Sequence, residues 1–501
     1  MIKKLLSSLA GLACVSAGLL HAQSPVTVKI QASTSTTAIP SDFIGLSFEI
    51  SNLFPEKNGT YQFSAGNHQL VTLFREVGIK SLRVGGGTAE PKSGNPADDA
   101  KYPVPGPKEI DQLFAFAEAA DLRIIYTLRL LRGDQANAVA VASYIAQHHA
   151  SRLDSFQIGN EPDWHAYHSY AGRPMDPDIY ETVSGEPGSA YPSYLAKWRA
   201  FAAAVRKGVP NARFSGPDTG SNYPVAGGKD TGYHGKSWTE NFAIDEKDSG
   251  LLTAVLPHDY VGQSAQNVSI PTAVDAMLSR LWVHTNYPAL YNYVLAPVQA
   301  TGLPYRMTEC NDYTGGVDGA SNAFASALWA LDYMHWHAAH GAVGLNFHNR
   351  RWIFTDTIYL APTGEYKINP KAYGLKAFSL GSHGRVAPVT ITNSDDVNLT
   401  AYAVVDDTTC YVTLINKEHD AGARDVVATL VSPTSVTRAD IISLAAPNGD
   451  VRAKTGVTLG GGTITNDQPW SGKWSNLAVG ADGRWTVNVP AASAVVVKLT
   501  K

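Results

Sequence analysis

Cysteine is nearly absent from this chain, which has 3 in 501 residues. Cys14 lies in an N-terminal apolar segment, so only Cys310 and Cys410 remain in the rest of the chain. Two distant thiols exclude a disulfide-rich scaffold, and the apolar core must therefore hold the protein together. We expect Cys310 and Cys410 to be buried free thiols.

Long runs of like charge are also lacking. The formal net charge is −4, and no run of Lys and Arg exceeds two residues. This balance gives no electrostatic footprint for nucleic acid, so no nucleic-acid partner is expected. The histidines have no carboxylate or Cys at metal-site spacing, and no glycine-rich segment has the Lys-Ser or Lys-Thr of a phosphate loop. The sequence therefore predicts neither a metal nor a cofactor.

The longest apolar stretch, residues 5–20, is interrupted by serines and glycine and falls short of the about 20 apolar residues of a membrane span. Lys3-Lys4 precedes it and the small-residue site His21-Ala22-Gln23 follows it, which is the layout of a secretory signal peptide. We expect residues 1–22 to be removed and the product to be secreted or periplasmic, with no membrane attachment. An uncleaved anchor and lipidation at Cys14 are the alternatives.

The remaining length, about 479 residues, predicts two domains. Between residues 41 and 382, short β-type runs alternate with helical patterns, such as Leu70, Leu73, Phe74 and Val77 at i, i+3, i+4 and i+7. Eight strands with intervening helices predict an α/β fold, a closed (β/α)8 TIM barrel. The candidate strands are Phe43 to Ile50, Ser81 to Gly85, Arg123 to Leu128, Ser155 to Gly159, Arg213 to Gly216, Thr253 to Tyr260, Tyr305 to Glu309 and Val343 to His348.

From residue 383 to residue 501 the pattern changes to strands without helices between them, which predicts an antiparallel β-sandwich. Residues 23–40 also contain a β-type run, Val26 to Ala32, which comes before the first barrel strand. We expect this N-terminal strand to pair into the C-terminal sandwich.

Glu161 ends the strand Ser155 to Gly159 in the sequence Asn160-Glu161-Pro162, where proline cannot continue the ladder. Glu309 repeats this arrangement at the end of the seventh strand. Barrel enzymes carry catalytic groups at the carboxyl ends of their strands, and strands four and seven approach each other across the mouth. The pair, Glu161 and Glu309, therefore predicts a retaining glycoside hydrolase, with the two carboxyl groups roughly 5 to 5.5 Å apart.

The segments Glu309 to Gly316 and Ser321 to Asp332 resemble glycoside hydrolase family 79, the family of β-glucuronidases and heparanase. Further similarity lies in Gly45 to Glu49, Leu82 to Gly86 and Pro370 to Leu375. The resemblance covers most of the chain from Val26 onward, more by architecture than by motif in the last quarter. It implies hydrolysis of β-D-glucuronides, or of a glycan that contains glucuronic acid, by double displacement, with Glu161 as general acid/base and Glu309 as nucleophile.

Carried over onto this sequence, the resemblance also implies a substrate-binding set. Asn160 is expected to contact the sugar 2-hydroxyl, and Tyr260, in His258-Asp259-Tyr260, to hydrogen-bond the nucleophile. The amides of Gly315 and Gly316 and the hydroxyls of Tyr313 and Tyr359 are expected to bind the glucuronate carboxylate, since glycine lets amide donors approach an anion closely.

Some residues depart from the family pattern. Asp312 is an acid close to the intended anion site, unless it points away, and His348-Asn349-Arg350-Arg351-Trp352 stands where a glycine-rich loop is frequent. Either Arg83 or Arg306 is expected to keep Glu309 ionised.

Two alternatives stay open at this point. One is another retaining hydrolase of the same clan acting on a neutral sugar, such as a xylosidase or arabinofuranosidase. The other is a noncatalytic carbohydrate-binding protein that keeps the barrel as a scaffold. The sequence leaves the oligomeric state open, with a monomer plausible.

Overall fold

The structure is a computed structural model of the chain. The described residues are 23–33, 38–91, 100–167, 169–170, 173–174, 190–220, 225–226, 229–230, 232–350 and 353–501. The predicted leader, most of the long connection from Asp163 to Pro187, and Arg351 and Trp352 lie outside them. Among the described residues, no helix combines the length and apolar character needed to cross a bilayer.

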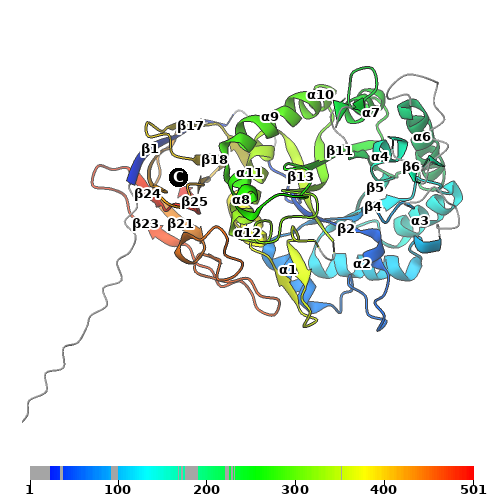
Figure 1. Ribbon diagram of the computed structural model, residues 1–501, viewed down its shortest axis with the longest axis horizontal. Helices are drawn as coiled ribbons and strands as arrows, with labels where there is room; N and C mark the ends of the chain where they lie inside the picture. Colours follow the sequence, from blue (N-terminus) through cyan, green and yellow to red (C-terminus); the bar gives the residue numbers. More distant parts are fainter. Residues whose placement is uncertain are drawn as a thin grey trace, which may run out of the picture.

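Eight parallel strands close into a barrel, which confirms the predicted fold class (Figure 1). In chain order the strands are β2 (Ile44–Glu49), β3 (Ser81–Gly85), β4 (Arg123–Leu128), β5 (Leu153–Ile158), β8 (Phe214–Thr219), β11 (Leu252–Tyr260), β12 (Tyr305–Asn311) and β13 (Ala342–Asn349). β13 pairs with β2 to complete the ring.

Helices surround the barrel because their apolar faces pack on the strands. The longer helices are α1 (His68–Val77), α2 (Pro107–Ala120), α3 (Gln135–His148), α6 (Ala190–Gly208), α11 (Phe324–Ala339) and α12 (Lys371–Gly381). Shorter ones are α4 (Pro162–Tyr167), α7 (Trp238–Glu246), α8 (Ile270–Leu278), α9 (Tyr287–Leu290) and α10 (Ala296–Ala300).

The helix α1 illustrates how the sequence sets these elements. The Asn67 side chain accepts a hydrogen bond from the Leu70 amide at the start of the helix, and Gly78 ends it in the left-handed conformation. The four residues of the predicted helical face are fully buried.

The C-terminal domain consists of two sheets. One has the order β17 (Val389–Thr392), β1 (Gln23–Ile30), β20 (Asp425–Val431), β24 (Trp485–Val489). The other contains β16 (Arg385–Ala387), β18 (Leu399–Val405), β19 (Thr409–Asn416), β25 (Ser493–Thr500), β21 (Arg438–Ala445) and β22 (Thr458–Leu459), with β23 (Ser475–Leu477) on β21.

The N-terminal strand β1 lies inside this sandwich, next to C-terminal strands, as Figure 1 shows in blue beside red. It pairs antiparallel with β17 but parallel with β20. The sandwich is antiparallel as expected, and the N-terminal strand joins it through this parallel pair as well. Val26 and Val28 of β1 are buried in the sandwich core, which ties the start of the chain to its end.

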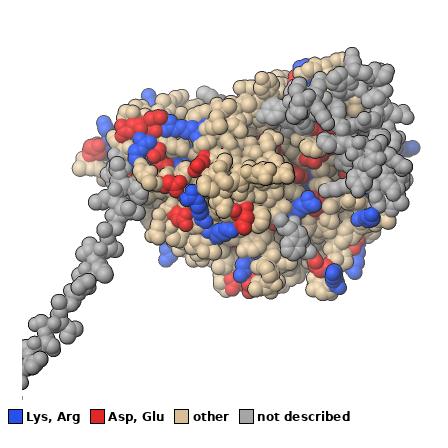
Figure 2. Space-filling view, viewed as in Figure 1, with Lys and Arg blue, Asp and Glu red and all other residues tan. Residues whose placement is uncertain are grey.

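The two domains share apolar packing. The barrel core is continuous with Ile442, Leu444 and Val496 of the second sheet, and α11 and α12 lie between barrel and sandwich (Figure 1). A buried ion pair also joins the domains. Lys417, the residue after β19, places its Nζ 2.8 Å from Oδ2 of Asp332 in α11. Cys310 and Cys410 are both buried and free, as expected. Acidic and basic side chains are interspersed on the face that Figure 2 shows.

Candidate active site

Glu161 is placed at the barrel mouth by the abrupt end of β5. Gly159 and Glu161 both have positive φ, 87° and 47°, and Pro162 begins α4 immediately afterwards. Positive φ is costly for a non-glycine residue and persists only where its surroundings enforce it. The Glu161 amide donates to the carbonyl of Asp218 at 2.9 Å, which anchors this strained residue to β8.

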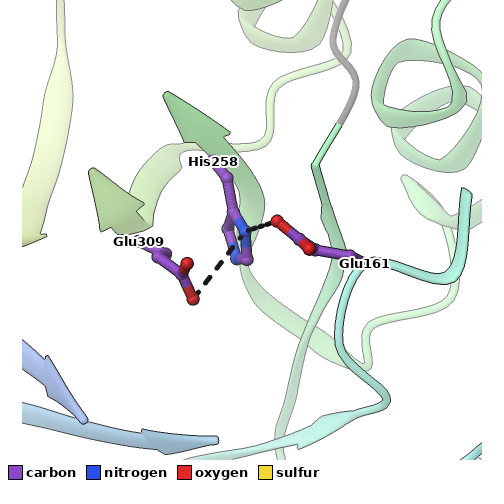
Figure 3. Close-up of side chains that lie close together, drawn as sticks. All are labelled: Glu161, His258 and Glu309. Carbon is purple, nitrogen blue, oxygen red and sulfur yellow. Dashed lines mark hydrogen bonds and ion pairs between the residues drawn. The ribbon is translucent and has the colours of Figure 1, made fainter. Parts of the chain in front are cut away.

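Glu309 lies within β12, which continues two residues beyond the predicted strand end. One carboxylate oxygen of Glu161, one ring nitrogen of His258 and one carboxylate oxygen of Glu309 all lie within 4.8 Å of one another. Figure 3 shows the imidazole between the two carboxyl groups, which point toward each other from β12 and from the end of β5. The barrel therefore brings together two glutamates that are far apart in sequence.

His258 links the two glutamates to a third acid. Its Nδ1 is 3.0 Å from Glu161 Oε1 and 4.0 Å from Glu309 Oε2, and its Nε2 is 3.0 Å from Asp218 Oδ1. Burial lowers the pKa of His258, but the charges of Asp218 and Glu309 outweigh it and raise that pKa to about 10. The ring is therefore a cation at neutral pH.

Arg83 is the buried cation that holds the nucleophile candidate. Its Nη1 donates to Glu309 Oε2 at 2.9 Å, and its Nη2 donates to Asn160 Oδ1 at 2.6 Å and to Asp218 Oδ2 at 2.5 Å. Arg306, the other arginine considered from the sequence, instead pairs with Asp42, near the opposite end of the strands. It lies one residue from the start of β12, which explains this difference.

The Glu309 carboxyl is surrounded by donors. The Tyr260 hydroxyl donates to Oε1 at 2.7 Å, and His348 Nδ1 is 3.7 Å from Oε2. Burial by itself raises the pKa of Glu309, but the charges of His348, His258 and Arg83 and the Tyr260 hydrogen bond hold it well below its usual range. Glu309 is thus ionised, the state that a nucleophile requires.

Glu49, at the end of β2, adds a further buried carboxylate to the mouth. It accepts hydrogen bonds from the amide and hydroxyl of Thr88 at 2.6 and 2.7 Å, and His348 Nε2 lies 3.7 Å away. Burial raises its pKa, but His348 and Thr88 together lower it to about 2. The half-exposed Arg350 reaches the same carboxyl, with Nε at 3.7 Å.

Sequence reasoning missed Asp218 and gave Glu49 no role. Asp218 is fully buried and has a positive φ of 64°. A signal was available for both, because each is a carboxylate at or near the carboxyl end of a barrel strand, as Glu161 and Glu309 are.

The spacing of Glu161, His258 and Glu309 also suits a metal ion, so the donor chemistry matters. Only neutral imidazole binds a metal, whereas the raised pKa of His258 keeps this ring protonated. Arg83 also occupies Oε2 of Glu309 with a hydrogen bond. The residues present fit an organic substrate between two carboxyl groups better than a cation.

Two of the predicted carboxylate-binding residues, Gly315 and Gly316, form the turn that follows β12. Gly315 and Gly316 have φ of 79° and 74°, and the Gly316 amide donates to the Tyr313 carbonyl at 3.1 Å. A side chain on Gly315 would meet nothing within 4 Å, so this glycine faces open space. The Gly315 amide has no acceptor among the described residues.

The two predicted tyrosines differ from this pair. Tyr313 is buried and packs its ring 5.7 Å from that of Trp282. Tyr359 lies in the short ribbon of β14 (Ile358–Leu360) and β15 (Tyr366–Ile368), opposite Lys367. No contact joins either tyrosine to Glu161 or Glu309 within the described part of the chain. The structure thus brings Asn160 and Tyr260 together with the two glutamates, but places Tyr313 in the surrounding core.

Comparison with known proteins indicates which family of enzymes the sequence resembles. Residues 401–496 match the sequence model described as the glycosyl hydrolase family 79 C-terminal beta domain. This confirms the predicted resemblance to glycoside hydrolase family 79. The matched residues form most of the C-terminal sandwich, and the match supports a glycoside hydrolase. A search of curated protein sequences gives no match.

Solved structures share the whole architecture. A 4-O-α-L-rhamnosyl-β-D-glucuronidase from Fusarium oxysporum matches with a TM-score of 0.69 and 19% identity, over 94% of this chain and 99% of that one. A family 51 arabinofuranosidase from Xanthomonas axonopodis matches with 0.62 and 14%, over 95% and 100%. An α-L-arabinofuranosidase from Thermotoga maritima matches with 0.63 and 12%, over 95% and 100%. At these identities the likeness establishes the fold.

Proposed function

We propose that this glycoside hydrolase cleaves β-D-glucuronides with retention of configuration, using Glu309 as nucleophile and Glu161 as general acid/base. The observation that carries the mechanism is the approach of their carboxylate oxygens to within 4.8 Å. Retaining enzymes need the two carboxyl groups roughly 5 to 5.5 Å apart, whereas inverting enzymes need room for a water between them.

In the first step a carboxylate oxygen of Glu309 attacks the anomeric carbon, and the bond from that carbon to the glycosidic oxygen breaks. Glu161 gives its proton to the departing oxygen. In the second step Glu161, now ionised, takes a proton from water as the water oxygen attacks the anomeric carbon and the ester bond to Glu309 breaks.

Asn160 is oriented for its proposed contact with the sugar 2-hydroxyl. Its Oδ1 is occupied by Arg83 Nη2, so the amide NH₂ is the end that the side chain offers to a ligand. A hydrogen bond to the 2-hydroxyl stabilises the transition state in this reaction class.

Three features support an acidic sugar. A Cβ on Gly315 would meet nothing within 4 Å, and no described backbone carbonyl accepts from its amide, which leaves that donor available to an anion. His348 and Arg350 add cations beside Glu49. The acid that seemed to oppose anion binding, Asp312, is fully buried and faces Lys371 Nζ at 3.9 Å. The similarity to a structure titled as a glucuronidase points the same way.

The substrate assignment is tested by comparing aryl β-D-glucuronide, β-D-glucoside, β-D-xyloside and α-L-arabinofuranoside under identical conditions. We expect kcat/KM for the glucuronide to exceed that for the glucoside by at least about 100-fold, because the glucoside lacks the carboxylate and loses its charge-assisted hydrogen bonds. Activity confined to a neutral sugar would favour the xylosidase or arabinofuranosidase alternative and leave the mechanism intact.

The mechanism has its own test. For Glu161→Ala with an aryl glucuronide that has a good leaving group, added azide is expected to restore turnover and to give the β-glucuronosyl azide. Glu309→Gln is expected to lower kcat by at least about 10⁴-fold. Unchanged turnover in Glu309→Gln would show that the observed hydrolysis does not come from this site, which is the result that the noncatalytic alternative predicts.

Export is proposed from the N-terminal pattern alone. N-terminal sequencing of the protein recovered outside the cytoplasm is expected to start near residue 23.

A further inference from the structure

Lys371 is a fully buried cation at the start of α12. Its three ammonium protons find three acceptors, Asn311 Oδ1 at 2.8 Å, the Thr355 carbonyl at 2.7 Å and the Thr355 hydroxyl at 2.6 Å. The rings of Trp329 and Phe347 lie 5.3 and 5.9 Å from the ammonium. Burying a lysine is costly because its ammonium loses its hydration. Here the three acceptors and the two rings compensate for that loss and hold the ammonium in one place.

The Lys371 contacts join three segments that are distant in sequence. Asn311 is the last residue of β12, Thr355 lies in the connection from β13 to β14, and Lys371 begins α12. The Thr355 hydroxyl in turn donates to Asp312 Oδ1 at 2.6 Å. Asp312 Oδ2 lies 3.9 Å from the ammonium, so one buried anion balances the buried cation.

The connection held by Lys371 is packed against the glycine turn. The Phe354 amide donates to the Gly315 carbonyl at 3.0 Å. A Cβ on Gly316 would lie 2.5 Å from the Thr355 amide nitrogen, which shows how closely the two backbones approach. The orientation of the turn therefore depends on the position of Thr355, and Thr355 is fixed by Lys371.

We propose that Lys371 is a positioning residue for uronic acid specificity: through Thr355 and Asp312 it fixes the Gly315–Gly316 turn so that the Gly315 amide faces the substrate carboxylate. This inference rests on the proposed glucuronidase function. Lys371 does not touch the substrate in this scheme, and it acts on binding of the sugar carboxylate rather than on the two glutamates.

The C-terminal domain holds the other side of the same helix. The Ile464 amide donates to the Tyr373 hydroxyl at 3.2 Å in the buried contact between sandwich and α12. Gly374 approaches α11 so closely that a Cβ there would lie 2.2 Å from the Ala327 carbonyl oxygen. Helix α12 is thus held rigidly by its neighbours, and it can serve as a fixed base for the ammonium of Lys371.

The test uses Lys371→Met, which keeps the length of the side chain and removes its charge. Binding of phenyl 1-thio-β-D-glucuronide and phenyl 1-thio-β-D-glucoside is measured by calorimetry, with kcat and KM for the aryl glucuronide. We expect Kd and KM for the glucuronides to rise at least about 10-fold, with Kd for the thioglucoside and kcat changed less than about 2-fold.

Lys376→Met is the matched control, because Lys376 lies on the same helix with its ammonium 5.0 Å from the Trp470 ring. It should leave both thioglycoside affinities unchanged. Thr355→Val removes the hydroxyl between Lys371 and Asp312, and it tests the same link should Lys371→Met fail to fold. We expect it to weaken thioglucuronide binding about 3- to 10-fold without affecting the thioglucoside.

The inference is overturned if either variant, Lys371→Met or Thr355→Val, folds and keeps the wild-type affinity for the thioglucuronide. It is also overturned if a variant loses affinity equally for both thioglycosides. A wild-type protein that binds the two thioglycosides equally overturns the proposed function itself, and the inference with it. The wild-type comparison therefore separates the two failures.

Discussion

Asp218 Oδ1 lies 3.0 Å from His258 Nε2, in a part of the barrel where both side chains are buried. The same carboxylate pairs with Arg83, so one anion holds two of the three cations that lie against Glu309. Burial raises the pKa of Asp218, but Arg83 and His258 lower it below its ordinary value. The two cations thus keep Asp218 charged.

Asp218→Asn is predicted to lower the free energy of unfolding by about 3 to 5 kcal/mol, because it leaves buried cations with less compensating charge. kcat should also fall, since Arg83 and His258 lose the partner that aligns them. Urea unfolding and aryl glucuronide kinetics measure the two effects.

Asp275→Asn is the control for this variant. Asp275 also lies 3.0 Å from a histidine, His419, but the carboxylate is 61% exposed. An exposed pair contributes less than about 1 kcal/mol. Equal destabilisation by the two variants would contradict the role assigned to burial.

Tyr260→Phe is predicted to lower kcat/KM about 10- to 100-fold, the value of a hydrogen bond to a charged group. The lost hydrogen bond had lowered the pKa of Glu309, so that pKa rises in the variant. The acidic limb of the kcat/KM profile should therefore move to higher pH. Tyr191→Phe removes a similar hydroxyl, 2.7 Å from Asp245, and should leave that limb in place.

Asp259→Asn is predicted to make stability less dependent on pH. Burial raises the pKa of Asp259 to about 7, although the Tyr333 hydrogen bond opposes this. A carboxyl with a raised folded-state pKa is stabilising below its unfolded value of 3.8, and this contribution is lost as the pH rises through 7.

The difference in unfolding free energy between Asp259→Asn and wild type should shift in favour of the variant by about 4 kcal/mol between pH 3 and pH 8. Urea unfolding across this range measures it. Asp407→Asn, at a carboxylate that is 95% exposed, is the control. A constant difference for Asp259→Asn would refute the prediction.

Asp332→Asn is predicted to lower the free energy of unfolding by about 3 to 5 kcal/mol, because the buried ammonium of Lys417 at the junction between the domains loses its carboxylate partner. The oxygen that accepts from Thr400 and Tyr402 at 2.7 and 2.8 Å can remain. Lys454→Met breaks the exposed pair with Asp318 and should cost less than about 1 kcal/mol. Thermal unfolding compares the two variants, and similar losses would count against the buried pair.

The barrel could be predicted from the sequence because hydrophobic alternation is local. The observed strand boundaries differ by at most three residues from the predicted ones, as at β8, which extends to Thr219 instead of Gly216. The parallel pairing of β1 with β20 is different, because it joins residues some 400 positions apart. No local pattern specifies the direction of such a pair.

At the site, the sequence singled out Glu161 and Glu309 because each ends a strand, and strand order is enough to place both at one mouth. It could not choose between Arg83 and Arg306, since both lie in barrel strands. The structure decides for Arg83, because it reaches Glu309, Asn160 and Asp218 together. The burial of Asp312 is likewise a tertiary result, because its carboxylate accepts from the Thr355 hydroxyl and lies 3.9 Å from the Lys371 ammonium.

What the sequence by itself determined is the barrel, the sandwich and the two glutamates, because strand periodicity and the residues at strand ends are local properties. Only the tertiary structure decided which charges surround Glu309, because His258, Arg83 and Asp218 come from three different strands. Electrostatic interaction depends on distance in space, and the closed barrel brings these groups within hydrogen-bonding distance.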